Sequence, residues 1–292
     1  MFTGAMVALI TPFQDGKVDF RTLDELIDFQ LENGIDAISP CGTTGESPTL
    51  SHSEHKEVIE RVVKAVGGKV PVIAGTGSNS TAEAIELTAF AKMVGADASL
   101  QVCPYYNKPT QEGFYQHFKM IAEEVDLPIV LYNIPGRCGG TGLTSETVVR
   151  LAEIENIVAI KESTGRLDMV SEIVTRCDMT IISGDDSLTL PIASVGGKGV
   201  ISVVANIVPA DVKAMTDLIL EGDFTSALKW HKKLFALCRD MLGLATNPIP
   251  VKAAMSMLDM APEELRLPMT PLEEKGKVAL RQTLKDYGLL EG

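Results

Sequence analysis

The stretch NIVAIKEST (Asn156–Thr164) is an apolar, β-branched run that carries a lysine, Lys161, in its interior. Its composition is typical of a strand buried on both faces of a parallel sheet. Most of the 26 Lys and Arg residues must lie at the surface, because an unpaired buried ammonium group is costly. Lys161 therefore needs either an ion-pair partner or a chemical role.

Runs of this kind alternate along the chain with amphipathic segments that have the spacing of helices. The eight predicted strands are Gly4–Thr11, Ile35–Gly42, Val70–Thr76, Ala98–Pro104, Leu127–Ile134, Asn156–Ser163, Met179–Gly184 and Gly199–Asn206. This alternation predicts an α/β fold with a closed parallel barrel, the (β/α)8 TIM barrel. An open doubly wound sheet is disfavoured, because no Gly-x-Gly-x-x-Gly motif follows the first strand.

Helix start signals lie between the predicted strands. Thr22, Ser51 and Ser80 are each followed three residues later by a glutamate, which predicts three capping boxes. After residue 222 the strand signal ends, and three helical segments follow at 225–242, 247–258 and 270–290. We therefore expect a barrel domain over residues 1–222 and a C-terminal helical extension over residues 223–292.

Composition excludes several functional classes. The formal charge of −13 argues against nucleic acid or an anionic membrane as a partner, but allows an anionic small molecule. No apolar run approaches the roughly 20 residues of a membrane span, and the N-terminus has no basic region typical of a signal peptide, so we expect a cytoplasmic protein. The five cysteines form neither a disulfide pattern nor a metal-binding cluster, and we interpret them as reduced thiols.

Active sites of TIM barrels lie at the C-terminal ends of the strands. Along the predicted sixth strand, Ala159 and Lys161 share one face, and Ile160 and Glu162 share the other. The larger aliphatic side chains suit the helix-facing side, so we expect Lys161 to point into the barrel, where removal from water favours a neutral, nucleophilic amine. The alternative is an ion pair with a carboxylate such as Glu162 or Asp185, and spacing alone does not separate the two.

Other polar residues at strand ends fit a lysine nucleophile. A Schiff base needs a proton shuttle, and Tyr132 can reach the same cavity as general acid/base, with Thr43 as a relay. In GTTGES (Gly42–Ser47), backbone N–H groups can converge on a small carboxylate. Arg137 suits a second carboxylate. Each feature alone also has an ordinary structural explanation: a core tyrosine, a polar loop and a surface arginine.

Several motifs in register carry a family resemblance. They are GTTGES, PVIAGTGSNSTAEAI, PYYNKPTQEGFYQHF, LYNIPGR, IKEST and SGDD, flanked by MFTGAMVALITPF, NPIPVKAAM and LRLPMTP. Together they resemble the dihydrodipicolinate synthase family of N-acetylneuraminate lyase-like class I aldolases. The resemblance implies condensation of pyruvate with L-aspartate 4-semialdehyde through a lysine Schiff base. The product is 4-hydroxy-tetrahydrodipicolinate, in the diaminopimelate route of lysine biosynthesis, and neither an organic cofactor nor a metal is needed.

The resemblance also implies roles for individual residues. Lys161 corresponds to the Schiff-base lysine and Tyr132 to the general acid/base, while Thr43 and Tyr106 complete its proton relay. The family supplies this second tyrosine from a neighbouring subunit, which implies a homotetramer built as a dimer of dimers. Four further residues match substrate-binding positions: Thr44 at the pyruvate carboxylate, Arg137 at the carboxylate of the aldehyde, and Gly184 and Ile201 along the cavity.

A second site is implied for the feedback inhibitor L-lysine. The residues that match it are Ser47, His52, His55, Asn79, Glu83 and Tyr105. Alternatively, Glu83 caps a helix and the two histidines are surface residues. One departure from the family pattern is the glycine-rich RCGGTGLT (Arg137–Thr144), which looks a residue longer than usual and bears on how Arg137 is held.

Two rival functions are weighed against this one. Another pyruvate-dependent class I aldolase, such as N-acetylneuraminate lyase or a 2-keto-3-deoxy sugar acid aldolase, shares the Schiff-base chemistry. Arg137 favours the synthase, because a sugar acid needs more hydroxyl partners and no second carboxylate clamp. A catalytically silent metabolite-binding relative is disfavoured by the intact set of Lys161, Tyr132, Thr43 and Tyr106.

Overall fold

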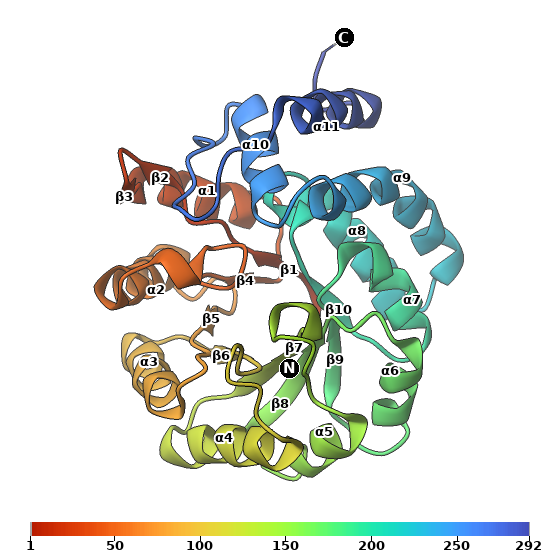
Figure 1. Ribbon diagram of the computed structural model, residues 1–292. Coiled ribbons are helices and arrows are strands. Elements are labelled where there is room, and N and C mark those ends of the chain that lie inside the picture. The colour runs from red at the N-terminus through yellow and green to blue at the C-terminus, as the bar shows by residue number, and fades with distance from the viewer. Residues whose placement is uncertain (1, 292) are drawn as a thin grey trace.

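A parallel barrel forms the centre of the computed structural model, which describes residues 2–291 (Figure 1). Its eight strands are β1 (Gly4–Ala8), β4 (Ala37–Ser39), β5 (Ile73–Gly75), β6 (Ala98–Val102), β7 (Ile129–Asn133), β8 (Ile157–Glu162), β9 (Thr180–Ser183) and β10 (Gly199–Ser202). They pair in the order β4-β1-β10-β9-β8-β7-β6-β5. A parallel bridge between Ile38 and Val72 brings the two edge strands together. Each predicted strand run contains one of these strands, so the predicted TIM barrel is confirmed.

Helices cover the outside of the barrel. Those between strands are α1 (Phe20–Glu32), α2 (His52–Val66), α3 (Thr81–Val94), α4 (Gln111–Glu124), α5 (Ser145–Leu151), α6 (Leu167–Val174), α7 (Thr189–Ser194) and α8 (Pro209–Glu221). Short 3-10 turns follow four of the strands: η1 (Ser47–Thr49), η2 (Pro135–Arg137), η3 (Asp186–Leu188) and η4 (Val204–Asn206). A small hairpin of β2 (Phe13–Gln14) and β3 (Lys17–Val18) precedes α1 and was not predicted.

Three further helices follow the barrel at one side (Figure 1). They are α9 (Phe224–Gly243), α10 (Ile249–Met257) and α11 (Glu274–Tyr287). Their apolar side chains share one hydrophobic cluster with the barrel, in which Leu234 and Val251 join Ile27 and Val58. The division into domains at residue 222 stays a prediction.

The capping signals were only partly correct. Ser51 and Glu54 form the predicted capping box at the start of α2. Ser80 accepts from the backbone N–H of Glu83, without a reciprocal bond. The prediction at Thr22 was wrong, because Asp19 accepts from the N–H groups of the first turn and starts α1 earlier. A carboxylate at the N-cap satisfies these donors as well as a hydroxyl does.

The barrel interior is a separate apolar cluster. Every barrel strand contributes to it, and its members are Met6, Ala8, Ala37, Ile73, Ala98, Leu100, Val130, Tyr132, Ala159, Ile182 and Ile201. Ala159 lies in this cluster, whereas Ile160 packs against the outer helices. The predicted alternation along β8 is therefore correct, and it turns Lys161 inward.

Two other sequence features concern the described residues. All five cysteines, which lie within residues 2–291, are free thiols. In the same part of the chain, none of the helices combines the length and the apolar character needed to span a bilayer.

Candidate active site

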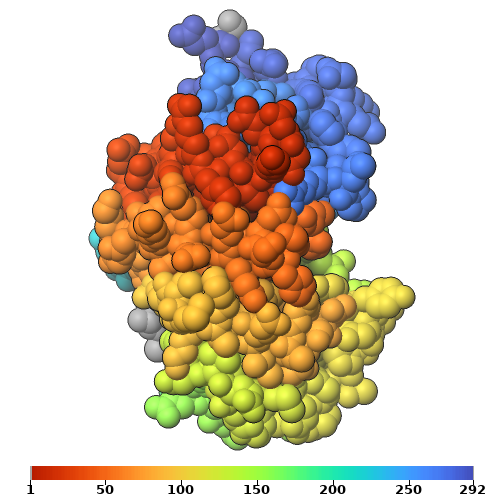
Figure 2. All heavy atoms as spheres, turned by 90° about the vertical axis from the view of Figure 1, so that its left-hand side faces the viewer, coloured from red at the N-terminus to blue at the C-terminus, as the bar shows by residue number. Residues whose placement is uncertain are grey.

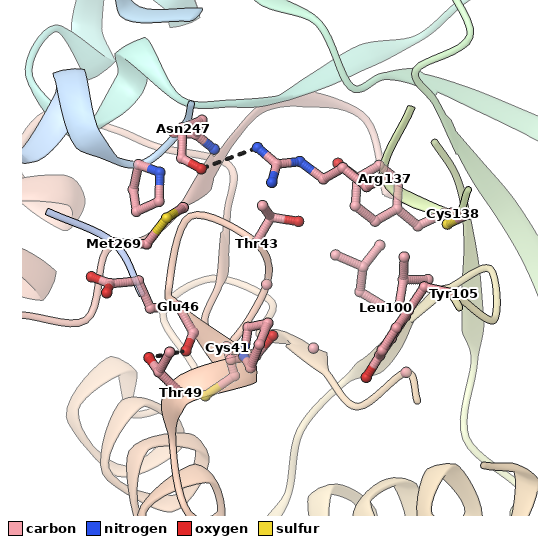
Figure 3. Close-up of a pocket in the computed structure, with 18 of the residues that line it drawn as sticks. Cys41, Thr43, Glu46, Thr49, Leu100, Tyr105, Arg137, Cys138, Asn247 and Met269 are labelled. Carbon is pink, nitrogen blue, oxygen red and sulfur yellow. Dashed lines mark hydrogen bonds between the residues drawn. The ribbon is translucent and has the colours of Figure 1, made fainter. Parts of the chain in front are cut away.

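A cavity of about 340 Å³ lies at the C-terminal ends of β4 to β7 (Figure 3). Its walls come from the loop after β4, from β5 to β7 with their loops, and from the C-terminal helical part. The polar side chains among the lining residues are Thr43, Glu46, Ser47, Thr49, Tyr105, Tyr132, Arg137 and Asn247. Segments distant in sequence thus meet at the end of the barrel where TIM-barrel enzymes carry their chemistry.

Lys161 lies beside Tyr132 inside the barrel. The two residues are paired in the register of β7 and β8, and Lys161 Nζ is 4.2 Å from the centroid of the Tyr132 ring. The lysine is only 5% exposed. Within residues 2–291 it has no ion-pair partner and no hydrogen bond to a side chain. The structure therefore leaves its amine free, next to a phenol.

The ion-pair alternative for Lys161 is not what the structure contains. Glu162 points the other way, where it accepts hydrogen bonds from Asn133 Nδ2 at 3.3 Å and from the Thr164 backbone N–H at 2.5 Å. Burial raises the pKa of Glu162. Asp185 accepts from the backbone N–H and hydroxyl of Ser187 at the start of η3. Both candidate carboxylates are therefore engaged elsewhere.

Gly184 lies beside Lys161, and Ile201 lies in the barrel interior. A Cβ atom at Gly184 would come within 3.0 Å of Lys161 Cγ and Cε and even closer to Ser163 Oγ. Any side chain here would collide with Ser163 and crowd the lysine, which is a physical reason for glycine. Ile201, on β10, belongs to the interior cluster with Tyr132. Gly184 therefore leaves room for the lysine side chain.

Thr43 and Thr44 occupy the loop after β4. Thr43 lines the cavity. Thr44 is 2% exposed, and its Oγ1 accepts a hydrogen bond from Asn247 Nδ2 at 3.0 Å. The next residue is fixed as well, because Gly45 O accepts from Thr11 Oγ1 at 2.7 Å. This loop is held from two sides and presents hydroxyl groups at the mouth of the barrel.

Arg137 reaches across the cavity toward Asn247 (Figure 3). Its Nη2 donates to the Asn247 backbone oxygen at 3.0 Å, which leaves other guanidinium N–H groups available to a ligand. The glycine-rich segment that follows is anchored by Asn133, whose Oδ1 accepts from the Leu143 N–H at 3.0 Å. Cys138 Sγ contacts Cys103 O at 3.1 Å. The unusual segment is thus tied to β6 and β7 at both of its ends.

Tyr106 does not join the other predicted catalytic residues within this chain. It is 90% exposed, and its φ of 69° lies in the left-handed region that aromatic residues rarely adopt. Figure 2 shows a yellow segment, near residues 105–110, projecting from the body of the molecule. A large aromatic side chain is therefore held outward by a strained backbone.

The residues matched to an L-lysine site form a partial cluster. His52 Nε2 lies 2.7 Å from Glu83 Oε1, the Ser78 hydroxyl donates to the same carboxylate, and Asn79 Nδ2 donates to Tyr105 O at 3.2 Å. Ser47 and Tyr105 line the cavity described above.

His55 is buried, although one interpretation of this cluster made both histidines surface residues. The alternative that both histidines are surface residues is wrong for His55, which is buried with Nε2 2.6 Å from Gly75 O. Burial lowers the pKa of His55. His52, one turn earlier, stays exposed.

Sequence reasoning missed one buried ion pair at the cavity. Glu46, with a φ of 53°, pairs with Lys252 on α10, and both are almost fully buried. Lys252 Nζ also donates to Glu264 O at 2.9 Å and lies 4.2 Å from the Phe13 ring centroid. Burial lowers the pKa of Lys252 against the attraction of Glu46. The sequence does contain a sign of this ion pair. Lys252 is a lone lysine in an apolar helical run, just as Lys161 is a lone lysine in an apolar strand.

Among residues 2–291, no group of three or more His, Cys, Asp or Glu side chains is arranged to hold a metal ion.

Comparisons with known proteins agree with the geometry. The model of the "Dihydrodipicolinate synthetase family" matches residues 1–287. The 4-hydroxy-tetrahydrodipicolinate synthase of Syntrophobacter fumaroxidans is 53% identical over 99% of this chain and 100% of its own. The crystal structure of dihydrodipicolinate synthase from Aquifex aeolicus has a TM-score of 0.97 and 53% identity, with 99% of each chain covered.

Two more solved structures contain relevant ligands. The chloride-inhibited dihydrodipicolinate synthase from Acinetobacter baumannii, complexed with pyruvate, has a TM-score of 0.97 and 44% identity, covering 99% of this chain and 100% of that one. The enzyme from Cyanidioschyzon merolae, with lysine bound, has a TM-score of 0.95 and 43% identity, covering 99% of each chain.

We predict that Lys252→Met destabilises the protein by about 3–5 kcal/mol, because it leaves the Glu46 carboxylate buried without its counter-charge. The measurement is urea-induced unfolding at a fixed protein concentration. The double variant Glu46→Gln/Lys252→Met should recover much of the loss, since it removes both charges. A single variant that is as stable as the double variant would contradict the structural role of the pair.

Proposed function

The chain belongs to the dihydrodipicolinate synthetase family, and we propose that it condenses pyruvate with L-aspartate 4-semialdehyde through a Schiff base on Lys161. The product is 4-hydroxy-tetrahydrodipicolinate, in the lysine-biosynthetic route. One observation carries the proposal: the unpaired Lys161 amine lies 4.2 Å from the Tyr132 ring centroid, inside the barrel. An amine used only for structure would have a carboxylate partner here.

In the first half of the mechanism, pyruvate binds and forms an imine with Lys161. Its carboxylate is bound by Thr43 and Thr44, at the loop that Asn247 and Thr11 hold in place. The Lys161 amine adds to the ketone carbon, and Tyr132 transfers protons until water leaves and an imine forms. Loss of a methyl proton then gives an enamine, because the protonated imine nitrogen accepts the electron pair.

In the second half of the mechanism, the enamine reacts with the aldehyde. The enamine carbon attacks the aldehyde of L-aspartate 4-semialdehyde, whose carboxylate is bound by Arg137. The substrate's amino group then attacks the imine carbon, which closes the ring and releases Lys161. No organic cofactor or metal takes part in this sequence, since the imine itself is the electron sink.

Tyr106 completes the site from a second copy of the chain in this proposal. Its exposure and its left-handed backbone support the idea, because it is held away from its own cavity. We propose a homotetramer, a dimer of dimers, in which the dimer is the smallest active unit. A cytoplasmic location is proposed with it, as expected for an enzyme acting on small cellular metabolites.

L-Lysine is proposed as an inhibitor that binds near Glu83. The relative with lysine bound supports this proposal, as does the contact between His52 and Glu83. A half-buried carboxylate is a suitable partner for an ammonium group. The cluster adjoins the cavity through Ser47 and Tyr105, which gives a physical route from inhibitor to site.

Borohydride reduction in the presence of pyruvate tests the central proposal. We expect a mass increase on the peptide that carries Lys161, because reduction makes the imine permanent. The peptide that carries Lys252 in the same wild-type sample provides the control, since Lys252 is also a buried lysine but should not react. An unmodified Lys161 peptide, or labelling confined to other lysines, would rule out the proposed chemistry.

Subunit complementation tests the placement of Tyr106. Tyr106→Phe and Lys161→Ala should each lose most activity alone. When the two variants are co-expressed, activity should rise above their sum, because a mixed dimer contains one site with both Lys161 and a partner's Tyr106. No gain over the separate variants would mean that Tyr106 acts within its own chain or not at all.

Inhibition assays test the L-lysine proposal. We expect L-lysine to inhibit the wild-type protein, and Glu83→Gln to raise the half-inhibitory concentration about tenfold, as for loss of a charge-assisted hydrogen bond. Glu60→Gln, at an exposed position on α2, is the matched control and should not change it. Absence of wild-type inhibition, or equal effects of both variants, would refute the proposed site.

A further inference from the structure

Asn247 connects the two proposed carboxylate-binding groups. Its side-chain Nδ2 donates to Thr44 Oγ1 at 3.0 Å, and its backbone oxygen accepts from Arg137 Nη2 at 3.0 Å (Figure 3). The residue lines the cavity and is 9% exposed. One asparagine therefore fixes the position of the pyruvate side of the site relative to the aldehyde side.

The side chain of Asn247 also has an unused acceptor. Its Oδ1 is buried and has no hydrogen-bond partner among residues 2–291. Leaving a buried polar group unpaired costs about 1–3 kcal/mol, so such atoms usually have a reason. A carbonyl oxygen only accepts hydrogen bonds, and the missing partner must therefore be a donor.

The orientation of the amide is consistent with the proposed use of Thr44. Because the threonine hydroxyl accepts from Nδ2, its own hydrogen stays free to donate to a carboxylate. The opposite amide orientation would use up this hydrogen. The observed arrangement keeps Thr44 as a donor toward pyruvate and leaves Oδ1 as an acceptor.

The second substrate has a hydrogen-bond donor that could pair with Asn247 Oδ1. In L-aspartate 4-semialdehyde the ammonium group is on the carbon next to the carboxylate. Arg137 is hydrogen-bonded to Asn247. When the substrate's carboxylate binds to Arg137, the substrate's ammonium group therefore comes close to Asn247. The only carboxylate lining the described cavity, Glu46, is neutralised by Lys252 and is not a free partner for a cation.

We propose that Asn247 selects the amino-bearing aldehyde, with its Oδ1 accepting a hydrogen bond from the ammonium group of the second substrate. This inference rests on the proposed function and assigns a substrate-specificity role to a residue of the NPIPVKAAM segment. The segment comprises most of α10 and the two residues before it, and it is not part of the barrel strands. The C-terminal helical part thus contributes to substrate choice.

A comparison of two aldehydes tests the inference. Succinate semialdehyde has the same carbon chain as L-aspartate 4-semialdehyde but lacks the amino group. With pyruvate consumption as the readout, kcat/KM is measured for both in the wild type and in Asn247→Ala. We expect the ratio of the two values to fall about tenfold in the variant, since a hydrogen bond to a charged group contributes about 1.5–3 kcal/mol.

Thr44→Val is the matched control, because it removes the partner of Nδ2 without touching Oδ1. Because it impairs pyruvate binding, it should lower kcat/KM for both aldehydes and leave the ratio of the two values as in the wild type. A merely structural role for Asn247 predicts the same pattern for Asn247→Ala, and an unchanged ratio in that variant would overturn the inference.

Two further measurements keep the inference testable if Asn247→Ala does not fold. Asn247→Asp retains an acceptor oxygen and should preserve or increase the preference for the amino-bearing aldehyde, and a tenfold loss of preference would count against the inference. In the wild type itself, equal kcat/KM values for the two aldehydes would also overturn it. Failure of the proposed function is distinguishable, because it appears as a missing pyruvate adduct on Lys161.

Discussion

The alternation of side chains along a buried parallel strand is the constraint on which the site depends. On β8 it turns Ala159 and Lys161 into the barrel and Ile160 and Glu162 toward the helices. A register shift of one residue would exchange the two faces and place the carboxylate inside. The pairing of Lys161 with Tyr132 across β7 and β8 follows from the same register. The amine and the phenol beside it are thus positioned by backbone hydrogen bonds.

Two buried lysines in this chain show how their partners decide their roles. Lys252 is paired with Glu46, donates to a backbone carbonyl and lies on an aromatic ring, so its charge is satisfied and its role is structural. Lys161 has the ring of Tyr132 as its neighbour but no carboxylate. The structural pair holds the loop that presents Thr43 to the cavity, whereas the free amine of Lys161 lies inside the barrel beside Tyr132. One buried lysine is therefore charge-paired, and the other has a free amine.

Much of the fold could be predicted from the sequence, because hydrophobic periodicity and turn residues act locally. All eight barrel strands lie within their predicted runs, and the three C-terminal helices lie close to their predicted ranges. Predictions failed where a side chain or a short segment had several possible partners or conformations and the sequence did not show which one would form. Asp19 takes the cap expected of Thr22, His55 turns toward Gly75 instead of solvent, and the hairpin of β2 and β3 is too short for its pattern to be recognised.

The sequence by itself determined the barrel, the inward direction of Lys161 and, through its motifs, the family. The tertiary structure decided which of the possible partners each side chain has. Thr44 and Asn247 are 203 residues apart along the chain, yet Asn247, which lines the cavity, donates a hydrogen bond to the buried Thr44. Likewise, Arg137 finds its acceptor 110 residues away. Periodicity is a property of neighbouring residues, whereas these contacts exist only because barrel closure and the packing of α10 bring distant segments together.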